Sequence, residues 1–262
     1  MVDISAIAVF HAEGSLAISA LSSMSRAVAI AREAGLSVEV LGFMDQPDPL
    51  TRRAVGAAGA WLDRLYEVDF GDVGMVRNKA AEAATGRYLS FLDGDDLWGE
   101  DWLISAWQAA EGAPGFDDVV WHPECLFIFE PNDLGLPTPP EGTAHPSATT
   151  FWFVQSDSDS AVFDPRILLF ENTWSANAFT LRRIHLLHPY QCLDSEGGFG
   201  IEDWSWNAQT LASGIRHKVV KDTVHLIRMK SEGSLNQLNQ ARGLLPVLPG
   251  LAARADSARG DL

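Results

Sequence analysis

The 262-residue sequence lacks the features that secreted, zinc-bound and membrane-spanning proteins need. Its two cysteines, Cys125 and Cys192, are too few for a disulfide framework and do not have the spacing of zinc ligands. No charged and then apolar leader opens the chain, and no stretch approaches the roughly 20 apolar residues that cross a bilayer. We therefore expect a reduced, cytoplasmic protein that meets the inner face of a membrane only peripherally or through a partner.

Basic residues are also scarce, because 19 Lys and Arg stand against 35 Asp and Glu and the net charge is -16. Such a surface repels nucleic acid and anionic lipid headgroups, so neither is expected as the main partner. A hydrophobic content of 47% supports a globular core, and the sequence shows no internal repeat. An acidic chain that binds an anion needs local positive charge, for which Arg77 and the cluster of Arg228 and Lys230 are candidates.

The first hundred residues alternate strand and helix patterns. Apolar runs predict strands over residues 4–10, 37–43, 63–68 and 88–92, and helical spacing predicts helices over 16–34, 48–59 and 74–86. Strand, helix and parallel strand form a right-handed crossover unit. The pattern predicts an α/β fold whose first half is a nucleotide-binding unit of a doubly wound sheet.

The pattern loosens after residue 100. Helices are predicted over 102–110 and 198–214, and strands over 118–122 and from 151. Residues 131–147 contain five prolines and little apolar content, which indicates an excursion from the domain and not a second domain. Residues 249–262 are expected to be a flexible tail or the stump of a larger polypeptide.

An apolar strand over residues 88–92 ends in Asp-Gly-Asp-Asp at residues 93–96. Carboxylates this close repel one another unless a cation lies among them, and Mg²⁺ and Mn²⁺ bind oxygen ligands while keeping positions open for phosphates. A calcium loop of the EF-hand type is disfavoured, because Leu97 and Trp98 occupy the places of its oxygen ligand and its glycine. The other interpretation is an acidic turn that caps the helix beginning near Glu100.

A second acidic pair, Glu202 and Asp203, opens the helix predicted over residues 198–214. Acids in a first helical turn can simply compensate the helix dipole. A carboxylate fixed at a helix start, with its pKa raised by a second carboxylate, can also act as a general base. Considered together with the acids at 93–96, this pair is a candidate for the chemistry of an active site.

Two stretches resemble the core of a family 2 glycosyltransferase with the GT-A fold. They are Phe-Gly-Asp-Val-Gly-Met-Val-Arg-Asn-Lys-Ala at residues 70–80 and Gly-Arg-Tyr-Leu-Ser-Phe-Leu-Asp-Gly-Asp-Asp at residues 86–96. Glu202 and Asp203, followed by Trp204 and a helix ending in glycine, match the second acidic motif of that family. The resemblance implies a mixed, mostly parallel central sheet with helices on both faces, in one Rossmann-like domain over residues 1–248. Its donor-binding half is expected over 1–100 and its acceptor-binding half over 101–248.

The resemblance also implies an activity. We expect a metal-dependent, inverting transfer of a sugar from a nucleotide-diphospho-sugar, a UDP-sugar first, to a hydroxyl of a carbohydrate or lipid-linked carbohydrate acceptor. The setting would be bacterial-type polysaccharide or glycoconjugate synthesis. Mn²⁺ or Mg²⁺ is the expected cofactor, with Asp95 as the first ligand and Asp93 and His225 as further ligands. Asp203 is expected to be the catalytic base, with Glu202 as the runner-up.

Other residues receive donor or acceptor roles. The expected donor contacts are Glu13 and Asp45 to base and ribose, Arg77 and Arg228 to phosphate, Asp93 to ribose or a metal-bound water, and Asp96 to the donor sugar. His11 is either a further donor contact or a histidine at a strand end whose hydrogen bonds are made within the protein. Two interpretations stay open for three aromatic residues, Trp121, His122 and Trp174. They either contact an acceptor sugar in a subsite or belong to the hydrophobic core.

Two other functions fit parts of the pattern. A sugar-nucleotide pyrophosphorylase shares the sheet and the metal, but residues 11–16 lack the basic residues expected in its loop after the first strand. A catalytically silent carbohydrate- or nucleotide-sugar-binding module of the same fold is the alternative outside the enzymes. Fold alone does not decide between them.

Overall fold

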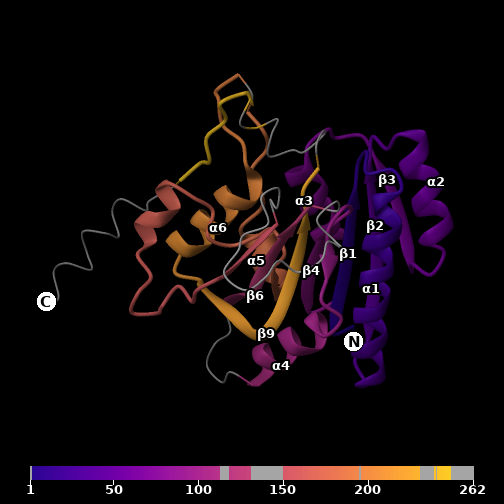
Figure 1. The fold of residues 1–262 in the computed structure, drawn as a ribbon, viewed down its shortest axis with the longest axis horizontal. Helices are drawn as coiled ribbons and strands as arrows, with labels where there is room; N and C mark the ends of the chain where they lie inside the picture. Colours follow the sequence, from indigo (N-terminus) through magenta and orange to yellow (C-terminus); the bar gives the residue numbers. More distant parts are fainter. Residues whose placement is uncertain are drawn as a thin grey trace, which may run out of the picture.

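The computed structural model describes residues 2–112, 118–130, 150–194, 196–230, 239 and 241–248. In this part of the chain a nine-stranded sheet runs through the molecule with helices packed against it (Figure 1). The excursion predicted over 131–147 and the tail predicted over 249–262 lie outside the described residues.

Crossover units build the N-terminal half as the sequence predicts. In chain order they are β1 (Ile4–Phe10), α1 (Leu16–Glu33), β2 (Val38–Asp45), α2 (Pro49–Ala58), β3 (Arg64–Val68), α3 (Val73–Ala83) and β4 (Tyr88–Asp93). Strand β1 pairs in parallel with β2 and β4, and β2 pairs in parallel with β3. The carboxyl ends of these strands therefore lie along one edge of the sheet, where open α/β sheets bind ligands.

The remaining elements extend this sheet. They are β5 (Leu97–Trp98), α4 (Trp102–Gly112), β6 (Val119–Phe129), β7 (Phe151–Val154), the 3-10 helix η2 (Pro165–Leu169), β8 (Phe179–Leu181), α5 (Arg182–Leu187), α6 (Glu202–Ala212) and β9 (Arg216–Arg228). The strand order is β3-β2-β1-β4-β8-β6-β9-β5, with β7 paired to β6. Because β8 runs antiparallel to both β4 and β6, the sheet is mixed, as predicted.

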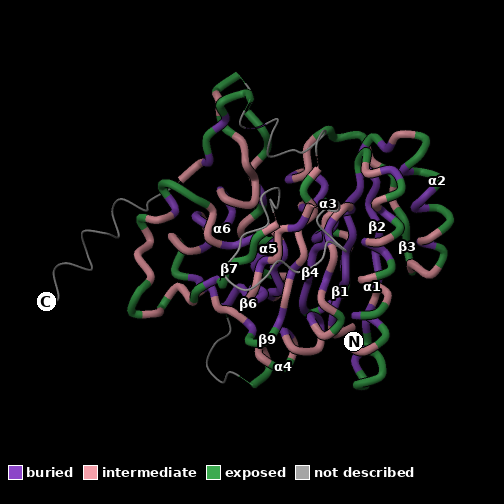
Figure 2. The backbone as a smooth tube through the Cα atoms, in the orientation of Figure 1, coloured by how far each residue is buried: buried purple, intermediate pink, exposed green. Residues whose placement is uncertain are grey.

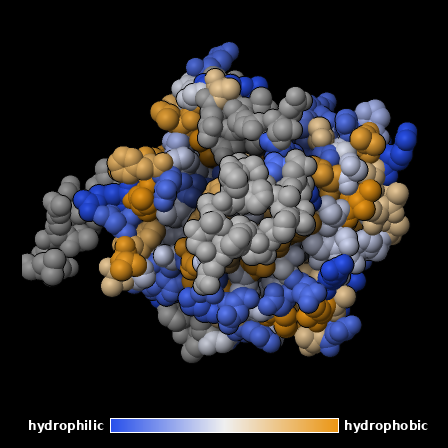
Figure 3. Space-filling view, in the orientation of Figure 1, coloured by the Kyte–Doolittle hydropathy of each residue, from blue (hydrophilic) through white to orange (hydrophobic). Residues whose placement is uncertain are grey.

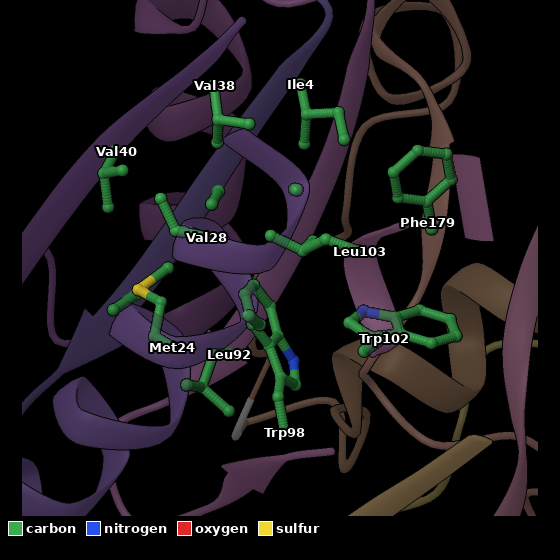
Figure 4. Close-up of a cluster of buried hydrophobic side chains, with 14 of the residues drawn as sticks. Ile4, Met24, Val28, Val38, Val40, Leu92, Trp98, Trp102, Leu103 and Phe179 are labelled. Atoms are coloured by element: carbon green, nitrogen blue, oxygen red, sulfur yellow. The ribbon is translucent and has the colours of Figure 1, made fainter. Parts of the chain in front are cut away.

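Hydrophobic cores fill both faces of the sheet. One core joins α1 and α4 to the sheet through side chains that include Met24, Val28, Trp102 and Leu103 (Figure 4). The other joins α3, α5 and α6 through Val76, Ile184 and Trp206. Within β1, Ile4 and Ala6 enter the first core and Ile7 and Val9 enter the second, as the period of a strand requires. Figure 2 shows the buried residues concentrated along this sheet, so helices cover both faces as predicted.

The surface is mixed in character. On the face shown in Figure 3, the described hydrophobic residues form separate groups among hydrophilic ones. Strand β7 carries Phe151, Trp152 and Val154 as exposed apolar side chains. Among the described helices, none is both long and apolar enough to cross a membrane.

Candidate active site

A cavity of about 450 Å³ opens at the carboxyl ends of β1, β2 and β4. Its wall contains Phe10 from β1, Asp45 from β2 and Asp93 from β4. Glu202 from α6 and Lys230 beyond β9 complete it from the C-terminal half. The volume is that of a small-molecule site, and the position is where a parallel sheet presents its loops. Acidic residues that lie far apart in the sequence therefore meet here.

Arg77 joins the two acidic motifs. Its Nη2 donates to Asp93 Oδ1 at 2.6 Å, its Nη1 donates to Glu202 Oε1 at 2.5 Å, and only 2% of its side chain is exposed. Although burial opposes it, the carboxylates of Asp93 and Glu202 raise the pKa of Arg77 well above its ordinary value. The guanidinium is therefore charged and held between two carboxylates, and its predicted contact with donor phosphate stays a prediction.

The local sequence explains why Arg77 is held so firmly. Asp72 accepts a hydrogen bond from the Met75 backbone N–H and so caps the start of α3. Asn78 donates to the Tyr190 carbonyl at 2.8 Å and accepts from the Tyr190 N–H at 2.8 Å. A Cβ at Gly74 would lie 2.8 Å from the Gln191 carbonyl oxygen, so glycine permits this close contact. Residues 190 and 191 thereby dock on α3 beside the arginine.

Asp203 is oriented by a chain of two asparagines. Asn172 Nδ2 donates to Asp203 Oδ2 at 2.9 Å, and Asn207 Nδ2 donates to Asn172 Oδ1 at 3.0 Å. Burial raises the pKa of Asp203 to about 7, Glu202 adds to the rise, and Arg77 opposes it. Such a pKa suits a general base near neutral pH. Of the described residues that line the cavity, Glu202 is one and Asp203 is not.

The residue before this acidic pair has a strained backbone. Ile201 has φ 61°, a left-handed conformation that β-branched residues rarely adopt. Gln46, which lines the cavity after β2, has φ 47°. Conformations of this kind cost about 1–3 kcal/mol and occur preferentially at functional sites. Ile201 is the residue that directly precedes α6, which begins with Glu202 and Asp203.

The turn after β4 is tied to the end of β9. Lys230 Nζ lies 2.6 Å from Asp95 Oδ2, and the Arg228 Nε donates to the Asp95 carbonyl at 3.0 Å. The Arg228 backbone N–H donates to Asp96 Oδ1 at 3.0 Å. A Cβ at Gly94 would lie 2.5 Å from the Phe10 ring, so the glycine between these acids lets the turn pack on β1. Basic residues of the C-terminal half thus already contact the predicted metal-binding turn.

His225 is paired with Asp96 inside the protein. Its Nε2 lies 3.3 Å from Asp96 Oδ2 and its Nδ1 lies 3.3 Å from Ser175 Oγ. Burial raises the pKa of Asp96, and His225 opposes this rise. The described residues contain no group of three His, Cys, Asp or Glu side chains placed to hold a metal, so the structure does not bring Asp93, Asp95 and His225 together.

An open metal site remains compatible with these residues. Mg²⁺ and Mn²⁺ commonly use one or two carboxylates and complete their coordination with water and substrate phosphates. Asp95 faces the cavity and already binds a cationic group, the Lys230 ammonium. The residues therefore fit a divalent ion that is held mainly by Asp95, with His225 outside the grouping.

Glu13 and Asp45 lie in the cavity wall, and each also binds backbone. Glu13 Oε2 accepts from the His11 N–H at 2.6 Å, and burial raises the pKa of Glu13 against the effect of this bond. Asp45 Oδ1 accepts from the Phe70 N–H at 2.7 Å and Oδ2 from the Asp72 N–H at 3.2 Å. Asp45 therefore shapes the loop before α3, and contact of either acid with a nucleotide stays a prediction. His11 Nδ1 lies 2.6 Å from the Asp45 carbonyl, so this histidine has a partner at the strand end.

The aromatic residues considered for an acceptor subsite are core residues. Trp121, His122 and Trp174 are all buried. Trp174 stacks on His217, whose Nδ1 lies 2.9 Å from His122 Nε2. Burial lowers the pKa of His217 to about 3 and that of His122 well below its usual range, so both rings are neutral. The core interpretation is confirmed for these three side chains.

Three contributors to the site had no sequence signal. Tyr190 lies under Arg77, with the guanidinium carbon 5.5 Å from the ring centroid, and Arg242 lines the cavity. Asn172 donates to Asp203 from 31 residues upstream, and no spacing rule connects the two. These contacts depend on how loops of the second half fold back on α3 and α6.

One segment of the chain matches a known protein family. The family model described as Glycosyl transferase family 2 matches residues 72–126, which contain Arg77 and the acids at 93–96. This segment of the chain is therefore similar to that glycosyltransferase family. No curated protein sequence matches the chain at a significant level.

Solved structures of glycosyltransferases share the fold of this chain. S. aureus TarS 1-349 in complex with UDP-GlcNAc has 16% identity, a TM-score of 0.54, and coverage of 88% of this chain and 60% of that one. Mannosyltransferase PcManGT from Pyrobaculum calidifontis, in complex with GDP-Man and Mn²⁺, has 16% identity, a TM-score of 0.59, and coverage of 97% and 64%. GalNAc-T7 with UDP, GalNAc and Mn²⁺ has 14% identity, a TM-score of 0.56, and coverage of 89% and 45%. The predicted GT-A-like architecture is therefore confirmed, and the chain spans less than two thirds of each of these proteins.

Proposed function

We propose that this chain transfers a sugar from a nucleotide-diphospho-sugar to an acceptor hydroxyl, with inversion at the anomeric carbon and with Mn²⁺ or Mg²⁺ as cofactor. The observation that carries the proposal is the Arg77 bridge, which holds Asp93 of the first acidic motif and Glu202 of the second at one cavity. The complexes of TarS with UDP-GlcNAc and of PcManGT with GDP-Man support a nucleotide-sugar donor. A UDP-sugar is our first candidate.

The donor would lie along the carboxyl edge of the sheet. Glu13 and Asp45 line the side of the cavity formed by β1 and β2, where base and ribose would bind. Arg228 and Lys230 line the side formed by β9, where their positive charge would face the diphosphate. Asp96, whose carboxylate is fixed by the Arg228 N–H, would orient the donor sugar.

The metal would be held by Asp95, with Asp93 close to it in the same turn. Mn²⁺ accompanies the nucleotide in the structures of PcManGT and GalNAc-T7, which supports a divalent ion here. When bound, the ion supplies positive charge next to the departing diphosphate.

We assign the catalytic base to Asp203 because its surroundings differ chemically from those of Glu202. Glu202 is bound to the Arg77 guanidinium at 2.5 Å, which keeps its carboxylate engaged. Asp203 has a pKa of about 7 and is oriented by the neutral amide of Asn172. It can therefore accept the proton of an acceptor hydroxyl near neutral pH, while Glu202 positions the acceptor.

The acceptor is expected to be a carbohydrate or a lipid-linked carbohydrate, in polysaccharide or glycoconjugate synthesis. A silent nucleotide-sugar-binding module would keep the cavity but not the chemistry, and a pyrophosphorylase would require pyrophosphate or a nucleoside triphosphate.

Turnover of a donor panel tests the proposal. The purified chain, given Mn²⁺ and UDP-, GDP- or TDP-sugars, is expected to release nucleoside diphosphate from at least one donor, faster when an acceptor glycan is added. Two control reactions provide the baseline. One contains EDTA, and in the other the nucleotide sugar is replaced by the free nucleotide. Binding of nucleotide sugars without any release of diphosphate would favour the silent module and contradict our proposal.

A further inference from the structure

Lys230 forms an ion pair with Asp95, the carboxylate that we propose as the metal ligand. It follows directly on Met229 at the end of β9, and its Nζ lies 2.6 Å from Asp95 Oδ2. The ion pair is sheltered, because 22% of the lysine side chain and 16% of the aspartate side chain are exposed. Ion pairs with this little exposure are screened less by solvent than surface pairs.

The surroundings of the lysine are acidic on several sides. Its charge also interacts with Glu13, in the loop after β1, and with Asp96, in the turn after β4. Asp95 and Glu13 in turn interact with each other as like charges. The ammonium group therefore offsets the repulsion that Asp95 meets from neighbouring carboxylates, and a divalent cation bound at Asp95 would offset the same repulsion.

We propose that Lys230 is a resident cation that holds Asp95 in the donor-free protein and has to leave it when a divalent ion binds. The inference rests on the proposed function, because it takes Asp95 as the metal ligand. A divalent ion alone has to break the 2.6 Å ion pair and leave the ammonium without its carboxylate. A nucleotide diphosphate supplies the displaced ammonium with new anionic oxygens on the same side of the cavity.

Metal and diphosphate should consequently bind cooperatively. The metal and the diphosphate share the free-energy cost of separating Lys230 from Asp95. The coupling free energy between the two ligands is the same for either order of addition. Lys230 would thus be a positioning residue that links entry of the metal to entry of the donor. It would also offset part of the negative charge of the cavity when no donor is bound.

Calorimetric titration with Mn²⁺ alone, and again with saturating UDP, tests this coupling. For the wild-type chain we expect weak binding of Mn²⁺ alone and binding at least about 10-fold tighter with UDP present. For Lys230→Met we expect Mn²⁺ alone to bind at least about 10-fold tighter than to wild type, and the gain from UDP to shrink. Lys230→Gln, which keeps a polar end without the charge, should give the same order of affinities.

Two control variants separate the effect from a general change in charge. Lys221→Met removes a lysine that is paired with Glu124 at 2.6 Å outside the cavity, so it should bind Mn²⁺ like wild type. Adding Asp95→Asn to Lys230→Met should abolish the gained affinity, which shows that the ion binds at Asp95 and not at surface acids.

The outcomes separate the role of Lys230 from the proposed metal-dependent donor site. If wild type binds Mn²⁺ tightly with UDP, but Lys230→Met binds Mn²⁺ alone no better than Lys221→Met, the resident-cation role is overturned and the donor site stands. If no variant binds Mn²⁺ with or without UDP, the proposed metal-dependent donor site is overturned together with the role of Lys230.

Discussion

The substitution Asp203→Asn should lower kcat by about two to four orders of magnitude and leave the dissociation constant of the donor unchanged. Removal of a general base has an effect of this size, and the amide of asparagine cannot take the proton of the acceptor hydroxyl. Donor affinity should persist, because Asp203 contacts Asn172 and the backbone of α6 and is not in the described wall of the cavity. Initial rates with a productive donor and acceptor, together with calorimetric binding of UDP, measure both quantities.

The pH profile and two further variants give this prediction its controls. Because the carboxylate form of Asp203 is the active one and its pKa is raised to about 7, wild-type kcat should fall as the pH drops through about 7. Asp118→Asn changes the same charge at an exposed residue paired with Arg183 and should be neutral. If Asp203→Asn kept wild-type turnover while Glu202→Gln lost it, the base would be Glu202 and our assignment would be wrong.

The substitution Asp95→Asn should remove the part of donor binding that depends on the metal. Changes to groups that only support a metal ligand cost about 10- to 100-fold in affinity, so loss of the ligand itself should cost at least that much. The fold should tolerate the change, because the Lys230 side chain is partly exposed at the cavity. Titration of UDP with and without Mn²⁺ measures the effect directly.

The matched control for this variant is Asp159→Asn. Asp159 also pairs with a lysine, Lys218, but it lies outside the cavity wall, so its loss should leave the response to Mn²⁺ intact. A strong Mn²⁺ dependence of UDP binding that survives in Asp95→Asn would show that other groups hold the metal.

The N-terminal half could be predicted from sequence because its rules are local. Strand β1 has the predicted bounds, and α2 begins at its Asp48 cap with Pro49 in the first turn. Parallel pairing then follows from the crossover units, and it places Asp45 and Asp93 at one edge of the sheet. The side of the cavity formed by β1, β2 and β4 could therefore be outlined from the sequence.

The second half depends on contacts between distant segments. Strand β6 continues to Phe129, well beyond the predicted end at residue 122, because β7 and β9 pair along its outer part. The short strand β5 pairs with β9, more than 100 residues further along the chain. The bridge from Arg77 to Glu202 and the pair of Lys230 with Asp95 have the same character, since no periodicity in the sequence encodes either one. No sequence pattern indicated that His225 pairs with Asp96, and metal ligation by His225 stays a prediction.

A crystal structure of the chain with UDP and Mn²⁺ tests most directly whether one cavity serves both acidic motifs. We predict anomalous scattering from manganese beside the Asp95 carboxylate, the diphosphate facing Arg228 and Lys230, and its sugar-bearing end directed at Glu202 and Asp203. Nucleotide bound elsewhere, or bound with its diphosphate turned away from Glu202 and Asp203, would contradict the account.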